Sequence, residues 1–155
     1  WLMLSSHYRN PLNFTEDVLN NVKKEVEKVE NILKQTSLDL QVHRIEKDEF
    51  NKETVDEMVN ALSDDLNTSL ALTLILNQVK VLNQLMRTRE KDYDAISNGY
   101  KTLLRMLDVM GFVYNERKLS DEDIELYNEW LNEKAAKNFA KADEIREVLK
   151  GKGII

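Results

Sequence analysis

The residues of this chain that could carry out catalysis or bind a metal are few and scattered. The two histidines, His7 and His43, lie far apart, and neither has a partner at the i, i+4 spacing that binds a metal on a helix. No serine stands in a G-x-S-x-G motif, there is no glycine-rich phosphate loop, and cysteine is absent. The sequence therefore predicts no catalytic residue and no metal ligand in this chain.

Two adjacent acids, Asp64 and Asp65, have the chemistry for proton transfer or metal binding. They stand just before Asn67 and Thr68, which we expect to cap a helix, with Thr68 as the N-cap itself. Carboxylates at this position are stabilised by the free N–H groups of the first helical turn. We therefore interpret the pair as structural.

The stretch "LSSHYRNPLNFT" contains His7, Tyr8 and Arg9 just before Pro11, the only proline. Pro11 cannot continue helical hydrogen bonding, and cations are favoured at a helix C-terminus. We predict that residues 1–8 end a helix and that the next helix starts at Asn13-Phe14-Thr15, with Phe14 packed onto its first turn. The trio then marks a helix-break-helix joint and not an active site.

The apolar residues recur at helical spacing along most of the chain, and Gly and Pro number only four and one. We expect helices near residues 16–35, 48–62, 68–87, 93–110, 120–136 and 139–150, and an extended linker over residues 36–46. Phe50, Val59 and Leu62 are expected to point inward with Val55 and Met58. The pattern predicts an all-α, antiparallel helical bundle that ends in a helical hairpin.

Charge is distributed unevenly. The net charge of −6 argues against a free-standing nucleic-acid binder. From residue 134 to the end, however, six basic residues outnumber three acidic ones, which gives +3. This tail is either an ordinary solvated helix face or a contact for a polyanion. Trp130, Tyr127 and Phe139 beside it could stack on bases, but at helical spacing such residues more often belong to a core.

Three motifs carry a resemblance to a known family. "LSSHYRNPLNFTEDVL" resembles the junction in cysteinyl-tRNA synthetases where the catalytic part meets the helical bundle. "ALSDDLNTSLAL" resembles that family's A-[ML]-x-D-D-[FL]-N-T-P-x-A motif, with Ser69 in place of the proline. "NEKAAKNFAKADEIREVLKGKGI" resembles its closing hairpin, and the Trp-containing tail that follows in the family is absent.

The resemblance implies a DALR-type anticodon-binding bundle of a cysteine–tRNA ligase and a chain cut from a longer protein. It implies residues 1–14 as the end of the linker to the catalytic domain, 15–118 as the bundle, and 119–155 as the hairpin. It also implies tRNA(Cys) and the protein's own catalytic domain as partners, a cytoplasmic monomer and no membrane contact. ATP and Zn²⁺ are expected in the missing catalytic domain and no cofactor in this segment.

Within that reading, five basic residues are candidates for contacts with the tRNA backbone, namely Lys137, Lys141, Arg146, Lys150 and Lys152. Arg9 is expected to brace the joint between domains. Two alternatives stay open. One is the bundle of a mycothiol-pathway cysteine ligase. The other is a non-enzymatic helical module that binds a protein through an apolar N-terminal end.

Overall fold

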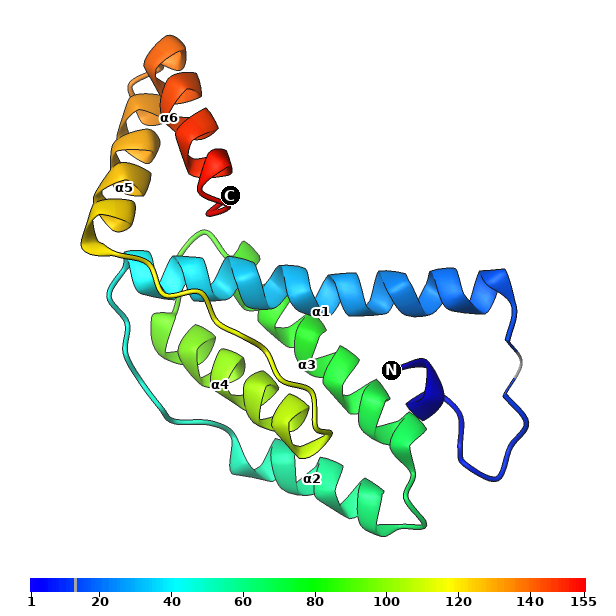
Figure 1. Ribbon diagram of the computed structural model, residues 1–155. Coiled ribbons are helices and arrows are strands. Elements are labelled where there is room, and N and C mark those ends of the chain that lie inside the picture. Colours follow the sequence, from blue (N-terminus) through cyan, green and yellow to red (C-terminus); the bar gives the residue numbers. More distant parts are fainter. Residues whose placement is uncertain (13) are drawn as a thin grey trace. The chain divides into compact units, whose positions relative to one another are not determined.

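The computed structural model describes residues 1–12 and 14–155, so the helix start predicted at Asn13 lies outside the described residues. Within them, the chain forms six α-helices, one short 3-10 helix and no strand, which confirms the all-α prediction (Figure 1). The structured residues divide into two compact units, described separately below. No helix in the described part of the chain is long and apolar enough to span a bilayer.

The first unit comprises residues 1–36 and 47–115. It contains the 3-10 helix η1 (Leu2–Leu4), the first part of α1 (Glu16–Val42), α2 (Lys52–Ser63), α3 (Thr68–Arg87) and α4 (Tyr93–Val109). Helix α3 packs against α2, α4 and η1, and α2 also packs against α4. Helix α3 is therefore the central helix of this unit.

The core of this unit consists of fully buried aliphatic side chains from α2, α3 and α4, including Met58, Ile75, Leu82, Ile96, Leu103 and Met106. Gly99 allows α3 and α4 to approach closely, since a Cβ there would lie 3.3 Å from Leu82. Helix α4 ends at Val109, and Gly111 follows its C-cap. Gly111 has a φ of +77°, the left-handed conformation in which glycine commonly terminates a helix.

The second unit comprises residues 37–46 and 116–155. Helices α5 (Asp121–Ala135) and α6 (Phe139–Gly151) pack against each other as the expected hairpin. Ser120 and Asp123 form a capping box at the start of α5. The apolar core is small, with Ile145, Leu149 and Ile154 buried and the end of α1 contributing Leu38.

The extended linker predicted for residues 36–46 is wrong over its first part, because α1 continues to Val42. Thr36 and Ser37 are 0% and 4% exposed and occupy core positions between Leu33 and Leu40. Two polar residues therefore stand where the helical repeat calls for apolar ones, and this hid the periodicity.

The helix predicted for residues 1–8 is also wrong, because only Leu2–Leu4 form a 3-10 turn. Phe14 is 71% exposed and does not pack as predicted. Thr15 does accept a hydrogen bond from the Val18 amide at the start of α1. Helix α2 begins only after Asn51, so Phe50 lies before it. Phe50 and Val59 are both exposed, whereas the sequence predicted that they point inward.

Candidate functional site

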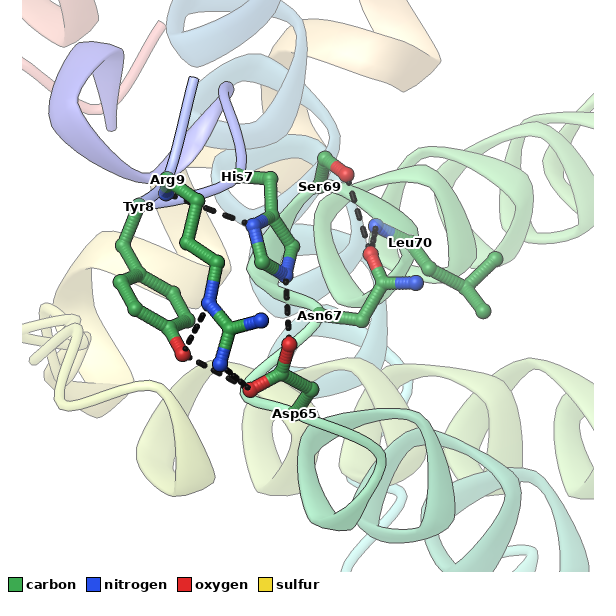
Figure 2. A network of polar contacts seen from close by, with 7 residues as sticks. All are labelled: His7, Tyr8, Arg9, Asp65, Asn67, Ser69 and Leu70. Carbon is green, nitrogen blue, oxygen red and sulfur yellow. Dashed lines mark hydrogen bonds and ion pairs between the residues drawn. The ribbon is translucent and has the colours of Figure 1, made fainter.

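His7, Tyr8 and Arg9 do not lie at a helix end but converge on Asp65, in the turn between α2 and α3 (Figure 2). The Tyr8 hydroxyl donates to the Asp65 carboxylate at 2.7 Å, and the Arg9 guanidinium contacts the same oxygen at 3.3 Å. His7 Nε2 lies 3.6 Å from the other oxygen. The hydrogen bond to Asp65 raises the pKa of Tyr8.

This polar cluster unites two of the sequence motifs, which stand far apart along the chain. Asp65 and Leu66 both have a φ of +53°, a left-handed conformation that is costly for residues with a side chain. The Asp65 carboxylate contacts side chains of the N-terminal segment, whereas the sequence predicted stabilisation by the N–H groups of the first helical turn. Pro11 follows this cluster in the chain, outside any helix.

The N-cap of α3 is Asn67, one residue before the predicted Thr68, which is the first helical residue. The Asn67 side-chain oxygen accepts hydrogen bonds from the Leu70 amide and the Ser69 hydroxyl (Figure 2). Ser69 thereby contributes a contact at the position where the motif has proline.

A second candidate site is a hollow of about 440 Å³ in the α5–α6 hairpin. Trp130 and Lys134 line it from α5, and Phe139, Ala142, Asp143, Arg146 and Lys150 line it from α6, with Ile155 beyond. Three of the lining side chains are cationic and only Asp143 is anionic. The expectation that Phe139 belongs to the core is wrong, because this ring is 61% exposed.

The aromatic side chains of α5 are only partly buried. Tyr127 and Trp130 pack against the small hairpin core, and their ring centroids lie 5.4 Å apart. Burial raises the pKa of Tyr127. The Lys134 ammonium lies 5.2 Å from the Trp130 ring centroid, a cation–π distance. Lys134 is thus a further candidate for a ligand contact at the hollow, and it was not among the five basic residues predicted from the sequence.

The five basic residues predicted from charge fall into two groups. Three are already paired with carboxylates: Lys141 with Glu129 and Glu133, Lys150 with Glu147, and Lys152 with Asp123. The other two, Lys137 and Arg146, form no ion pair within the described residues. The hydrogen bond from Lys150 lowers the pKa of Glu147, and the nearby Arg146 charge adds to this effect.

The ion pairs of the hairpin shift the pKa values of their members. Hydrogen bonds to Glu129 and Glu133 raise the pKa of Lys141 well above its ordinary value. The hydrogen bond from Lys152 lowers the pKa of Asp123, a residue only 8% exposed. Charge on this hairpin is therefore largely internally compensated, and its uncompensated cations lie at or near the hollow.

The described residues contain no group of three or more His, Cys, Asp or Glu side chains that could hold a metal ion. The polar cluster offers hydrogen bonds and ionic contacts, and the hairpin hollow offers aromatic surface and positive charge.

Residues 57–114, from α2 to just past α4, match the model of the DALR domain family. Over its whole length, the chain is homologous to the C-terminal third of cysteine–tRNA ligases. It is 31% identical to the enzyme of Mesoplasma florum and 33% identical to that of Halalkalibacterium halodurans, covering 100% of this chain and 35% of each relative. With the enzyme of Prochlorococcus marinus the identity is 33%, over 99% of this chain and 37% of the relative. The chain thus spans about a third of the length of the curated relatives it matches.

Proposed function

We propose that this chain is the tRNA-binding helical domain of a cysteine–tRNA ligase. In that role it holds tRNA(Cys) while a catalytic domain outside this chain joins cysteine to the 3′ end of the tRNA at the expense of ATP. ATP and zinc would belong to the part of the relatives that this chain does not cover. Residues 1–14 would be the joint to that part, 15–118 the bundle and 119–155 the hairpin, and Arg9 would brace the joint.

The observation that carries this proposal is the hairpin hollow. An exposed aromatic ring at Phe139 and a partly buried one at Trp130 provide stacking surfaces that accept any base. Lys134 and Arg146 on the same hollow provide positive charge for a phosphate. Aromatic rings interleaved with cations are the combination by which proteins bind unpaired nucleotides, such as those of a tRNA loop.

Of the five basic residues predicted from charge, Arg146 lines the hollow without an ion pair to any described residue and is the strongest proposal. Lys150 also lines the hollow, but its ammonium pairs with Glu147. Lys137 lies at the turn between α5 and α6 and remains available. Lys141 and Lys152 would have to leave carboxylate partners to contact a phosphate, so we propose smaller contributions from them.

The test is the binding of a tRNA(Cys) transcript to the 155-residue chain. Phe139→Ala should weaken binding by about 5- to 150-fold, because stacking of one base contributes about 1–3 kcal/mol. Phe139→Trp should retain binding. The double variant Lys134→Gln/Arg146→Gln should weaken binding and reduce its salt dependence.

The matched control for charge is Lys52→Gln/Lys80→Gln, which removes two exposed cations from α2 and α3. If this control weakens binding as much as the hollow variants do, the hollow is not the binding site. An unchanged affinity in Phe139→Ala would exclude base stacking there.

The protein-interaction alternative relied on a free apolar N-terminal end. In the structure, the Trp1 ring packs 5.3 Å from Phe112 and its indole N–H donates to Glu25. Trp1, Leu2 and Leu4 are therefore partly covered within their own unit, while Met3 is 79% exposed. We propose tRNA binding over that alternative because Trp1 is not free.

A further inference from the structure

The N-terminal segment, residues 1–12, is held on the first unit by two sets of side-chain contacts. In the first set, the Trp1 indole N–H donates to Glu25 at 3.0 Å and the ring packs against Phe112. In the second, residues 7–9 all contact the carboxylate of Asp65 (Figure 2). Both sets lie within the same compact unit, so the segment follows the surface of that unit instead of extending away from it.

The Asp65 carboxylate is the centre of the second set, because each of its oxygens has a partner. Oδ1 accepts hydrogen bonds from the Tyr8 hydroxyl and the Arg9 guanidinium, and Oδ2 faces His7 Nε2. The partners also support one another. Arg9 Nε donates to the Tyr8 hydroxyl at 2.9 Å, and the His7 and Tyr8 rings stack with their centroids 4.7 Å apart. One carboxylate therefore fixes three consecutive side chains at once.

The backbone on both sides of these contacts is also constrained. Asp65 and Leu66 keep a left-handed conformation, and such strain persists where surrounding contacts fix it. Leu66 is 62% exposed, so the contacts that fix this turn are those of the Asp65 carboxylate. The N-terminal segment contains no glycine, and Pro11 restricts both its own φ and the conformation of Asn10. Flexible linkers, by contrast, are rich in Gly and Ser.

We propose that Asp65 is a positioning residue that clasps the N-terminal segment to the bundle and makes this segment a rigid extension of the bundle, not a flexible tether. The use of the clasp rests on the proposed function. If the segment is the joint to a catalytic domain, a rigid joint would hold the bound tRNA at a fixed orientation to that domain. A flexible joint would leave the orientation to be found anew in each binding event.

The test is tryptic cleavage after Arg9 in the folded 155-residue chain, because trypsin can cut there only when the segment leaves Asp65. Asp65→Asn removes the charge, and asparagine tolerates a left-handed backbone, so the turn should keep its shape. Asp64→Asn is the matched control. It removes the same charge one residue away, and the Asp64 side chain forms no hydrogen bond or ion pair with any described residue. Circular dichroism would check that both variants keep the wild-type helical content.

Cleavage after Arg9 tracks the population in which the segment is released. Asp65→Asn should speed this cleavage by about threefold to tenfold, since contacts to an exposed carboxylate contribute modestly. Asp64→Asn should leave it close to wild type. Cleavage after Lys80, within α3, reports on opening of the bundle and should not change in either variant. An equal acceleration after Lys80 would show general destabilisation and overturn the positioning role.

A second readout is the titration of the Tyr8 phenol, followed by NMR of ¹³C-labelled tyrosine. The hydrogen bond to Asp65 raises the pKa of Tyr8, so Asp65→Asn should lower this pKa and Asp64→Asn should not. Tyr8→Phe should speed cleavage less than Asp65→Asn does, and it should add little in the double variant. The proposal is overturned if either readout fails to respond to Asp65→Asn, or if Asp64→Asn has the same effect.

The clasp and the proposed function fail separately, because neither readout involves RNA. If Asp65→Asn changes nothing, the clasp falls, and the Phe139 variants still decide whether the hairpin hollow binds tRNA. If the chain binds no tRNA but both readouts respond as expected, Asp65 positions the segment and only its use in presenting a tRNA falls.

Discussion

The two compact units of this protein are stabilised in different ways. The bundle of α2, α3 and α4 buries a continuous set of large aliphatic side chains, several of them 0% exposed. The α5–α6 hairpin has three buried apolar side chains in its cluster and depends in addition on ion pairs across its two helices. The difference shows where a ligand can enter the hairpin: beside its small core lies a hollow lined by the exposed ring of Phe139.

The largest expected effect is on the free energy of unfolding, when a fully buried leucine in each core is replaced by alanine. Leu103 in α4 and Leu149 in α6 are both 0% exposed. Leu103→Ala should lower the free energy of unfolding by about 2–5 kcal/mol. Leu149→Ala should cost less, since its small core can collapse around the missing side chain.

Hydrogen exchange followed by mass spectrometry would assign each loss to its unit. Leu103→Ala should speed exchange in α2–α4, and Leu149→Ala should speed it in α5 and α6. Identical exchange changes across both units in either variant would show that they unfold as one, and the comparison would break down.

A smaller effect on stability should come from placing glycine where the backbone has a left-handed conformation. Lys137, after the end of α5, has a φ of +61°, where glycine is favoured. Lys137→Gly should raise the stability of the hairpin by about 1 kcal/mol. Leu66→Gly should do the same for the α2–α3 turn of the bundle, where Leu66 is 62% exposed.

Chemical denaturation measures both changes. Lys137→Ala is the matched control, because it removes the same charge without relieving the backbone, and it should not stabilise. A stabilisation by alanine equal to that by glycine would assign the gain to charge instead.

The smallest expected effect is on the acid sensitivity of the hairpin. The Lys152 hydrogen bond lowers the pKa of Asp123 below its ordinary value, so the folded state favours the carboxylate. This contribution is present above the pKa of an unfolded aspartate and is lost as pH falls through the lower folded value. Acid should therefore destabilise the hairpin at this pair.

Asp123→Asn should lower the melting temperature at neutral pH and flatten its decline toward acid pH. Asp121→Asn, at a side chain 81% exposed, should change the profile much less. If the two variants have the same pH profile, the Asp123–Lys152 pair does not contribute in the way described.

Local signals in the sequence located much of the fold. Ser120 and Asp123 have the side chains of a capping box, and Gly111 stands where a left-handed residue ends a helix, so both boundaries were predictable. The helix end predicted near residue 35 was wrong because polar side chains occupy core positions there. Thr36 and Ser37 took core positions that a periodicity analysis assigns to apolar residues, and α1 continued through them.

The candidate sites were predictable in part. The basic character of the tail and its aromatic residues were visible in the sequence, and so was the motif of His7, Tyr8 and Arg9. The pairing of Lys152 with Asp123 was not visible, since the two meet only when α6 folds back along α5. The i, i+3 pair of Lys150 and Glu147 and the i, i+4 spacing of Trp130 and Lys134 are local, but the place of Lys134 on the hollow depends on α6.

By itself, the sequence determined an all-helical protein, most of its helix boundaries and its likeness to one part of cysteine–tRNA ligases, because periodicity, capping and motifs are local properties. Only the tertiary structure decided that Asp65 receives Tyr8 and Arg9, that Phe139 is exposed, and that Lys141 and Lys152 pair with carboxylates of α5. These outcomes depend on side chains from distant segments meeting, and no local pattern records which segment a given face will meet.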